Sequence, residues 1–386
     1  MPIINRLADF ADEITAWRRD MHAHPELLFE VHRTAGLVAD RLRQFGCDEV
    51  ATGIGRTGVV GVIRGRSAGS RTIGLRADMD ALPIEEQTGA PYKSQTPGLM
   101  HACGHDGHTA MLLGAAKYLA ETRNFDGTVV VIFQPAEEGG GGGNEMVKDG
   151  MLERFGIQEV YGMHNWPGMP VGHFAIRRGP IMAAADRFEI TIEGRGGHAA
   201  HPHKNVDSLL VGAQVVTALQ TIVARNADPL DAAVISVCSF KAGDAFNVMP
   251  QFANLLGTVR TLSPDMRDLC EERIKAVTQN IAAAFGATAT VNYMRGYPVT
   301  FNHDEQTDFM GKVAAQVGFS VDTTVLPQMG AEDFSYMLNQ RPGAYIFMGN
   351  GDSAECHHPA YDFNDEAIPY GASLWAKIVE ERLPAR

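Results

Sequence analysis

Short runs of almost unbroken apolar residues alternate, in the first part of the chain, with segments whose apolar residues recur at helical spacing. Three such runs predict strands at 59–63, 71–77 and 128–134, and the last of them is typical of a strand covered on both faces of its sheet. Amphipathic segments predict helices at 5–20, 32–46, 109–122, 144–152 and 306–317. This alternation predicts an α/β layer architecture.

The pattern changes near Asp186. Residues 188–193 alternate apolar and polar positions as a half-buried strand does, and they begin the order strand, helix, strand, strand, helix, strand. This β-α-β-β-α-β order is typical of the ferredoxin-like split βαβ motif. We expect the six elements at 188–193, 205–224, 233–240, 252–260, 264–285 and 288–293. After residue 298 the pattern returns to helix 306–317 and a strand at 344–348.

The length of the chain, 386 residues, exceeds what one hydrophobic core usually spans and favours two domains. We predict a two-domain α/β protein in which 1–184 and 298–386 form one mixed-sheet α/β domain. Residues 185–297 would form a smaller ferredoxin-like domain inserted into it. The two ends of such an insert are expected to lie close together, as tolerated insertions require.

Composition and charge exclude several classes of function. The net charge of −13, without any Lys/Arg cluster longer than a pair, predicts a protein that binds no nucleic acid. The longest apolar stretches are shorter than a membrane span, and the N-terminus lacks the apolar core of a secretory signal. We therefore expect a cytoplasmic protein with no membrane partner. Its five scattered cysteines do not form a disulfide framework and are expected to be reduced.

Potential metal ligands follow several of the predicted strands. One thiol, three imidazoles and a carboxylate lie within 101–108, and the full set, with His358 as an alternative to its last member, is Cys103, His105, Glu137, Glu138, His164 and His357. Open α/β sheets bind ligands at the carboxyl ends of their strands, so these side chains are expected to converge. Thiolate, imidazole and carboxylate together suit zinc, manganese, cobalt or nickel rather than calcium. Each residue taken singly is typical of a polar loop, and the glycine run 139–143 could equally be a linker.

Six motifs occur together along nearly the whole chain: WRRDMHAHPE (17–26), LRADMDALP (75–83), MHACGHDGH (100–108), QPAEEG (134–139), GMHN (162–165) and MGAEDF (329–334). In combination they resemble the amidohydrolase family of bacterial hippurate hydrolases, N-acyl-amino-acid deacylases and plant indole-acetyl-amino-acid hydrolases. This family is part of the wider aminoacylase and carboxypeptidase G metallopeptidase clan. The resemblance implies a site for two divalent metal ions in the larger domain, with the insert as a lid and dimerisation domain.

Carried over to this sequence, the resemblance assigns a role to each candidate. It implies that the Cys103 sulfur bridges two cations, one completed by His105 and His164 and the other by Glu138 and His357. The His-x-Pro spacing favours His357 over His358 as the ligand. Glu137 matches the general base, and Asp80 matches an acidic residue that orients a metal-bound histidine. Asp78 and Asp106 are interpreted as ordinary strand-end and loop carboxylates, and His22 and His24 as a polar pair in a loop.

The insert contributes a second set of candidates. The resemblance implies that His198 donates a hydrogen bond to the oxyanion, often from the partner subunit, and that Asn247 and Arg260 contact the carboxylate end of the substrate. A guanidinium is well shaped for bidentate carboxylate binding. The alternative for Arg260 is a solvated strand residue, because many surface arginines bind nothing.

The predicted reaction is metal-dependent hydrolysis of the amide bond of an N-acyl amino acid, which releases a carboxylic acid and a free amino acid. The alternative is a dipeptidase or carboxypeptidase of the same clan, but a cysteine at the bridging position, where peptidase relatives usually carry aspartate, favours the amidohydrolase. A metal-binding protein without turnover would need no spare base, so Glu137 favours catalysis. The expected partners are the small-molecule substrate and further copies of the chain, in a homodimer or a dimer-based tetramer.

Overall fold

The computed structural model describes residues 3–385 and divides into two compact units. Within the described residues, the first unit comprises the chain up to Ile181, Phe301–Leu326 and the chain from Asp333 onward. The second unit comprises Met182–Thr300 together with Pro327–Glu332. The short segment 327–332 in the second unit is an addition that the hydrophobic pattern did not indicate.

The first unit is built on an eight-stranded mixed sheet with the order β1-β2-β4-β3-β5-β16-β6-β15. Its strands are β1 Glu49–Ile54, β2 Gly58–Arg64, β3 Ser67–Asp78, β4 Asp126–Gln134, β5 Glu159–Trp166, β6 His173–Ala175, β15 Ser320–Asp322 and β16 Gly343–Gly349. Strand β3 runs parallel to both β4 and β5, and β5 runs parallel to β16. The carboxyl ends of these four central strands therefore share one edge of the sheet, where ligands of α/β folds bind.

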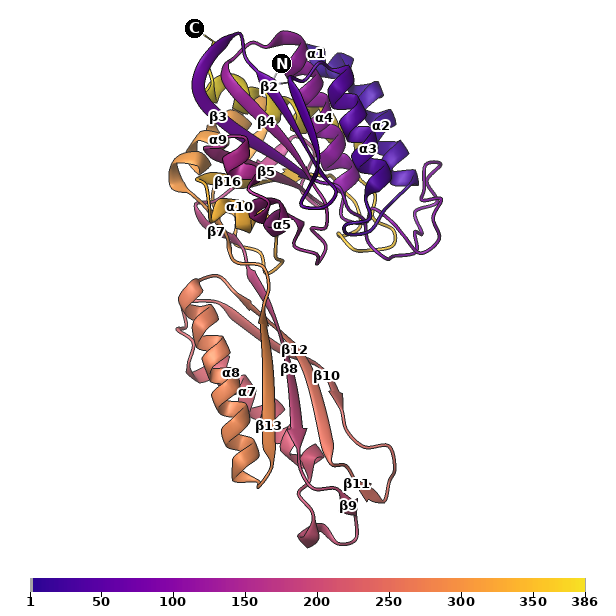
Figure 1. Ribbon diagram of the computed structural model, residues 1–386, viewed down its shortest axis with the longest axis vertical. Helices are drawn as coiled ribbons and strands as arrows, with labels where there is room; N and C mark the ends of the chain where they lie inside the picture. The colour runs from indigo at the N-terminus through magenta and orange to yellow at the C-terminus, as the bar shows by residue number, and fades with distance from the viewer. Residues whose placement is uncertain (1–2, 386) are drawn as a thin grey trace. The chain divides into compact units, whose positions relative to one another are not determined.

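Helices cover this sheet and bury its apolar strands. They are α1 Asn5–Asp9, α2 Ala11–Ala23, α3 His32–Gln44, α4 His105–Thr122, α5 Gly142–Lys148, α6 Met151–Arg154, α9 Asp304–Val317, α10 Ser335–Leu338 and α11 Ile368–Arg382. Helices α2, α3 and α4 lie side by side (Figure 1). Most of α4 is buried, because it packs between β3 and the helices α2 and α11. Its first residue is therefore held firmly at the edge where the parallel strands end.

The second unit has the predicted order of elements. They are β8 Ala184–Glu193, α7 Ser208–Arg225, β10 Ala233–Lys241, β12 Phe252–Thr261, α8 Pro264–Ala284 and β13 Thr288–Arg295. The strands form an antiparallel sheet in the order β10-β12-β8-β13, and α7 packs against both this sheet and α8 (Figure 1). The ferredoxin-like prediction for this part of the chain is confirmed.

Several local predictions were wrong. The segment expected as one helix at 5–20 is two helices, α1 and α2, and α4 begins at His105 rather than at residue 109. The strands β1, β6 and β15 and the C-terminal helix α11 were not predicted; β1 and β15 are edge strands, and β6 and β15 have only three residues each, so they carry weak periodicity.

Helix α7 bears on the expectation that no apolar stretch is long enough to span a membrane. Within residues 3–385 it is the one helix whose length and composition would allow it to cross a membrane. The sequence predicted an amphipathic helix at 205–224 and no membrane span. Val211, Val215 and Leu219 of α7 are buried in the core of the second unit, and 33% of the helix is buried in all.

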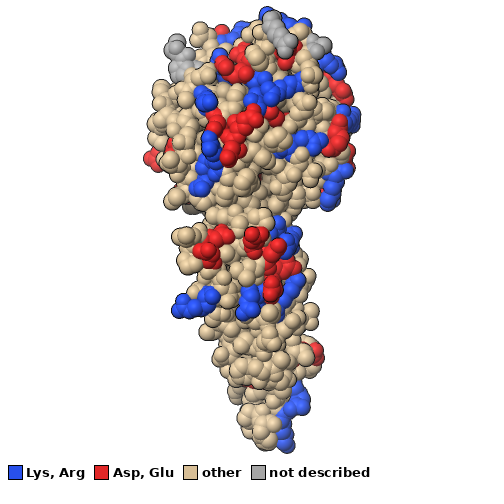
Figure 2. Space-filling view, turned by 90° about the vertical axis from the view of Figure 1, so that its left-hand side faces the viewer, with Lys and Arg blue, Asp and Glu red and all other residues tan. Residues whose placement is uncertain are grey.

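Charged side chains are mixed on the surface. On the face shown in Figure 2, acidic and basic side chains of the first unit are interspersed, without one large field of either sign.

Candidate metal centre

The cysteine-histidine loop is held in a tight conformation at the start of α4. Gly104 has φ of +85° and precedes His105, the first residue of the helix. A Cβ atom on Gly104 would lie 2.4 Å from Nδ2 of Asn165 and 2.4 Å from Oη of Tyr361. Cys103, at 8% exposed, and His105, at 0%, are therefore positioned by a residue that has to be glycine.

Replacing Gly104 with alanine is expected to lower the free energy of unfolding by about 2–4 kcal/mol, since it adds both backbone strain and overpacking. Gly89→Ala is the matched control: its φ is +70°, and no atom lies within 4 Å of the added Cβ. The control should cost only about 1 kcal/mol from strain. Urea unfolding of both variants measures the difference, and equal losses would show that the close approach at Gly104 is unimportant.

The predicted ligands of the first cation lie together. The ligand atoms of Cys103, His105 and His164 are all within 4.8 Å of one another. Sγ of Cys103 is 3.4 Å from Nε2 of His164. His164 lies within β5 and His105 begins α4, so the set joins a strand end to a helix start.

The predicted ligands of the second cation also lie together. Cys103, Glu138 and His357 form another group whose ligand atoms are within 4.8 Å of one another. Nε2 of His357 is 3.2 Å from Oε1 of Glu138. Because Cys103 belongs to both groups, its sulfur lies where a bridging ligand is expected. His358 is exposed, and its Nδ1 accepts a hydrogen bond from the backbone N–H of Ala360 instead.

The donor set fits two divalent cations. Nε2 of His105 is buried without a hydrogen-bond partner among the described residues, although such atoms normally have one. Burial alone would lower the pKa of His105, but the charges of Asp78, Asp80 and Glu138 outweigh it and raise that pKa to about 10. Carboxylates that stabilise an imidazolium would also stabilise a cation bound there.

Two backbone carbonyls fix the ring orientation of the histidines. Nδ1 of His105 lies 2.9 Å from the carbonyl oxygen of Asp80, and Nδ1 of His164 lies 2.6 Å from that of Asn165. An Nδ1–H that donates to a carbonyl leaves Nε2 as the free ligand atom. Burial, and then the neighbouring His108, hold the pKa of His164 well below its ordinary value, which keeps the ring in the neutral form that metals require.

Asp80 organises both glutamates. Its side chain is buried, Oδ1 accepts a hydrogen bond from the N–H of Glu137, and Oδ2 accepts one from the N–H of Glu138, each at 3.0 Å. The preceding Ala136 has φ of +55°, a strained value for a residue with a side chain. Glu137 is 8% exposed and lies within 4.8 Å of His105 and Glu138, measured between ligand atoms. The carboxylate proposed as the base is thus next to the ligands.

A buried hydrogen-bond network next to Cys103 was not predicted. Nδ1 of His108 donates to Oδ1 of Asp78 at 2.6 Å, while its Nε2 accepts the backbone N–H of Asn165 at 2.9 Å. Asn165 in turn donates from Nδ2 to the carbonyl oxygen of Cys103 at 2.6 Å. Asp78 is therefore not an ordinary strand-end carboxylate, because it holds His108, which together with Asn165 supports the loop that carries Cys103. The signals in the sequence were the spacings Asp78-x-Asp80 and His105-x-x-His108.

Asp106 and His22 were also misinterpreted from the sequence. Both side chains are buried, and Nδ1 of His22 lies 2.8 Å from Oδ2 of Asp106. Nη1 of the buried Arg18 is 3.5 Å from the same oxygen. Burial alone would lower the pKa of His22, but the charge of Asp106 outweighs it and raises this pKa to about 9.

This pair is expected to make stability depend on pH. The folded pKa of His22 exceeds its ordinary value of 6.5, so its contribution is complete below pH 6.5 and is lost as pH rises through about 9. Wild-type protein should lose about 1–3 kcal/mol of unfolding free energy over this window. The loss should be smaller in His22→Gln, which keeps only the contribution of His105, and unchanged in His24→Gln, a half-buried neighbour. Urea unfolding at a series of pH values measures it, and an unchanged slope in His22→Gln would contradict the assignment.

The remaining predicted residues belong to the second unit. His198 and Asn247 are exposed, and His198 pairs with Val248 across the short ladder between β9 Gly197–His198 and β11 Val248–Met249. Arg260 is half-buried in β12, and its Nη1 donates to the carbonyl oxygen of Val259 at 3.0 Å. Their roles toward a substrate stay predictions.

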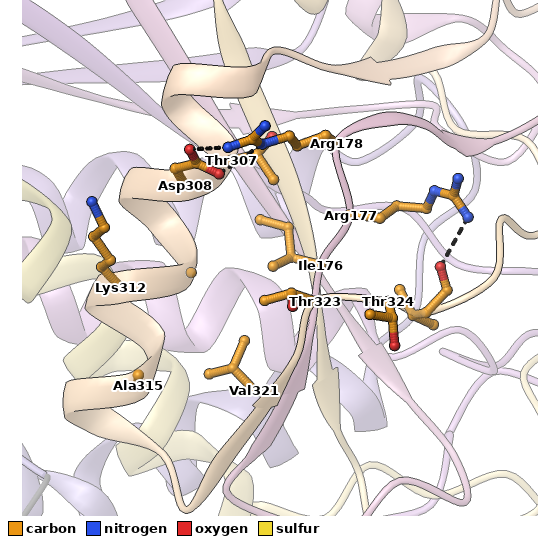
Figure 3. Close-up of a pocket in the computed structure, with 12 residues that line it drawn as sticks. Ile176, Arg177, Arg178, Thr307, Asp308, Lys312, Ala315, Val321, Thr323 and Thr324 are labelled. Atoms are coloured by element: carbon orange, nitrogen blue, oxygen red, sulfur yellow. Dashed lines mark hydrogen bonds and ion pairs between the residues drawn. The ribbon is translucent and has the colours of Figure 1, made fainter.

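A groove of about 840 Å³ lies elsewhere in the first unit, between α9 and β15. Figure 3 shows Ile176 and Val321 on one side of it and Lys312 and Ala315 on α9, with Arg178 paired to Asp308 at one end. None of the predicted site residues lines this groove. The chemistry is therefore assigned to the cysteine-histidine centre and not to this hollow.

Known proteins are similar to this chain over nearly its whole length. The family described as peptidase family M20/M25/M40 matches residues 74–381. A hippurate hydrolase of Campylobacter jejuni is 42% identical over 380 residues, 98% of each chain, and a thermostable carboxypeptidase of Saccharolobus solfataricus is 40% identical over 392 residues, again 98% of each. The crystal structure of a dinuclear metal binding peptidase of the M20 family from Bacillus subtilis superimposes with a TM-score of 0.86 at 34% identity, covering 98% of this chain and 100% of the other.

Proposed function

We propose, because this chain belongs to peptidase family M20/M25/M40, that it hydrolyses the amide bond of N-acyl amino acids and releases a carboxylic acid and a free amino acid. One observation carries the proposal: Cys103 belongs to two groups of potential metal ligands, and the Glu137 carboxylate lies beside them. A site that only stored metal would need the ligands but no additional base.

Two divalent cations bound here would lower the pKa of a water molecule, polarise the amide carbonyl and stabilise negative charge on its oxygen. The residues proposed to hold them are Cys103, His105, Glu138, His164 and His357. The Glu137 carboxylate is proposed to take the proton of the attacking water. It then passes this proton to the leaving nitrogen, which departs as a neutral amine rather than an anion. Asp80 keeps Glu137 in place through its backbone N–H.

Residues of the second unit are proposed to recognise the substrate. His198 would donate a hydrogen bond to the carbonyl oxygen as negative charge develops on it. Asn247 and Arg260 would bind the carboxylate of the amino acid. The identity of 42% with a hippurate hydrolase supports an aromatic acyl group on the substrate. The identity of 40% with a carboxypeptidase supports the alternative, a dipeptidase or carboxypeptidase of the same clan.

A substrate panel tests the proposal. Protein stripped of metal and reloaded with manganese, zinc, cobalt or nickel is assayed with benzoyl, acetyl and indole-acetyl amino acids beside dipeptides. We expect kcat/KM for at least one acyl amino acid to exceed that for every dipeptide by about tenfold or more, the usual discrimination of a fitted pocket. A preference for dipeptides would establish the alternative, and no turnover with any metal would overturn both.

The protein is further proposed to act in the cytoplasm and to assemble as a homodimer or a dimer-based tetramer. Support for the assembly comes from the edge strand β10 of the second sheet and from exposed apolar side chains in or beside it, Leu209, Leu210 and Phe240. Sedimentation equilibrium tests the assembly, and Leu210→Asp should shift it toward monomer. A wild-type protein that is monomeric at micromolar concentration would contradict this proposal.

A further inference from the structure

Cys356, which the mechanism does not use, lies beside the proposed bridging cysteine. The backbone N–H of His357 donates to the carbonyl oxygen of Ala102 at 2.7 Å. This bond joins the chain next to Cys356 to the chain next to Cys103. His357 itself has φ of +68°, so the backbone reverses there and keeps the short loop against residues 102–103.

This backbone bond brings the two thiols close enough to influence each other. The Cys356 thiol, followed by burial, raises the pKa of the Cys103 thiol well above its ordinary value. Cys103 is buried, whereas Cys356 is half-buried, so solvent reaches only the second sulfur readily. The other cysteines are separate: Cys47 lies near Asp48 and Arg123, and Cys238 and Cys270 belong to the second unit.

We propose that Cys103 and Cys356 form a reversible disulfide in the metal-free protein, which makes oxidation and metal binding mutually exclusive. A disulfide needs the two Cα atoms within about 7 Å of each other. The backbone bond between His357 and Ala102 holds the two segments side by side, as this requires. The inference rests on the proposed role of Cys103 as a ligand. A sulfur held in the disulfide would be lost from both ligand groups, Cys103-His105-His164 and Cys103-Glu138-His357, at once.

The proposed oxidant of the two thiols is a hydroperoxide. The Cys356 sulfur attacks one peroxide oxygen, an S–O bond forms, the O–O bond breaks, and the thiol proton leaves with the other oxygen as water. The Cys103 sulfur then attacks the Cys356 sulfur, the S–O bond breaks, and the second oxygen leaves as water with the Cys103 proton. Two thiols have lost two electrons and hydrogen peroxide has become two waters. A dithiol reverses the reaction by exchange.

Peptide mapping under non-reducing conditions tests the bond itself. The full-length protein is freed of metal, treated with hydrogen peroxide, and blocked with an alkylating reagent. We expect the wild type to lose two of its five free thiols and to yield a peptide pair that joins Cys103 to Cys356. Cys238→Ser, which removes an exposed cysteine of the second unit, should behave in the same way. Cys356→Ser should yield no such pair.

Metal analysis tests the exclusion. Oxidised wild type should bind neither cation until dithiothreitol restores its thiols, and protein loaded with zinc before oxidation should keep all five. The metal-free Cys356→Ser variant should lose metal-binding capacity to peroxide about tenfold more slowly than wild type, with full binding before oxidation. Failure to find the joined peptides, or equal rates in the two proteins, would overturn the proposal.

The two ideas can fail separately. A joined peptide pair in a protein that still binds both cations would refute the ligand role of Cys103 and leave the disulfide standing. A Cys356→Ser protein that binds less metal before any oxidation would show that Cys356 is itself a ligand, and would overturn the inference while the hydrolase proposal stands.

Discussion

Glu137→Gln is expected to abolish turnover while both metal ions remain bound. The amide keeps the shape of the carboxylate and its backbone bond to Asp80, but it cannot accept the proton of water and return it to the leaving nitrogen. Loss of a positioned general base typically costs 10²–10⁴-fold in rate, so kcat should fall by about three orders of magnitude. Steady-state kinetics on the best acyl amino acid, with elemental analysis of the same sample, measure both quantities.

Glu145→Gln is the matched control for this prediction. Glu145 lies on α5, a few residues after Glu137, and pairs with Lys148 on the surface. Its replacement should leave kcat and metal content unchanged. Unchanged turnover in Glu137→Gln would remove this residue from the role of base, and a loss of metal in that variant would make it a ligand instead.

Asp80→Asn is expected to lower both metal affinity and turnover, although Asp80 is assigned to neither group of ligands. Its two oxygens each accept a backbone N–H, from Glu137 and from Glu138. In asparagine one oxygen becomes an NH₂ group, which would face an N–H donor, so the loop 136–138 would have to move. Loss of an outer partner of this kind typically costs 10–100-fold in metal affinity or activity.

Isothermal titration with zinc and steady-state kinetics measure the two effects. Asp149→Asn serves as the control, because Oδ2 of Asp149 also accepts a backbone N–H, that of Gly55 at 2.7 Å, but outside the metal centre. The control should retain metal affinity. If Asp80→Asn bound metal as tightly as wild type with unchanged kcat, the backbone bonds of Asp80 would have no part in positioning the two glutamates.

The hydrophobic pattern was sufficient for the regular parts of the fold. Period-two alternation in 188–193 and long amphipathic helices at 205–224 and 264–285 identified the ferredoxin-like order of the second unit. The pattern did not identify α11, most of whose residues up to Trp375 are buried, so that its charged residues gather only in its second half. It also missed the early start of α4, which depends on one glycine in the left-handed conformation.

Residue type was informative for the candidate metal ligands and misleading for the buried polar residues around them. Cysteine, histidine and paired glutamates at strand ends predicted the candidate centre, and the structure brings these donors within 4.8 Å of one another in groups of three. Asp78, Asp106 and His22 looked like ordinary polar residues, since nothing in their local sequence reveals burial. Only packing shows that Asp78 bonds His108 and that His22 bonds Asp106.

The sequence alone determined the family, the two-unit architecture and the set of side chains able to hold metal, since each of these depends on local periodicity or on residue type. Tertiary structure alone decided that Asp78 holds His108, that His22 pairs with Asp106 and that the backbone next to Cys356 bonds the backbone next to Cys103, and it brought the predicted ligands together around one sulfur. The physical reason is distance along the chain: residues 103, 138, 164 and 357 are separated by whole strands and helices, and only the packing of parallel strands brings their ends to one edge.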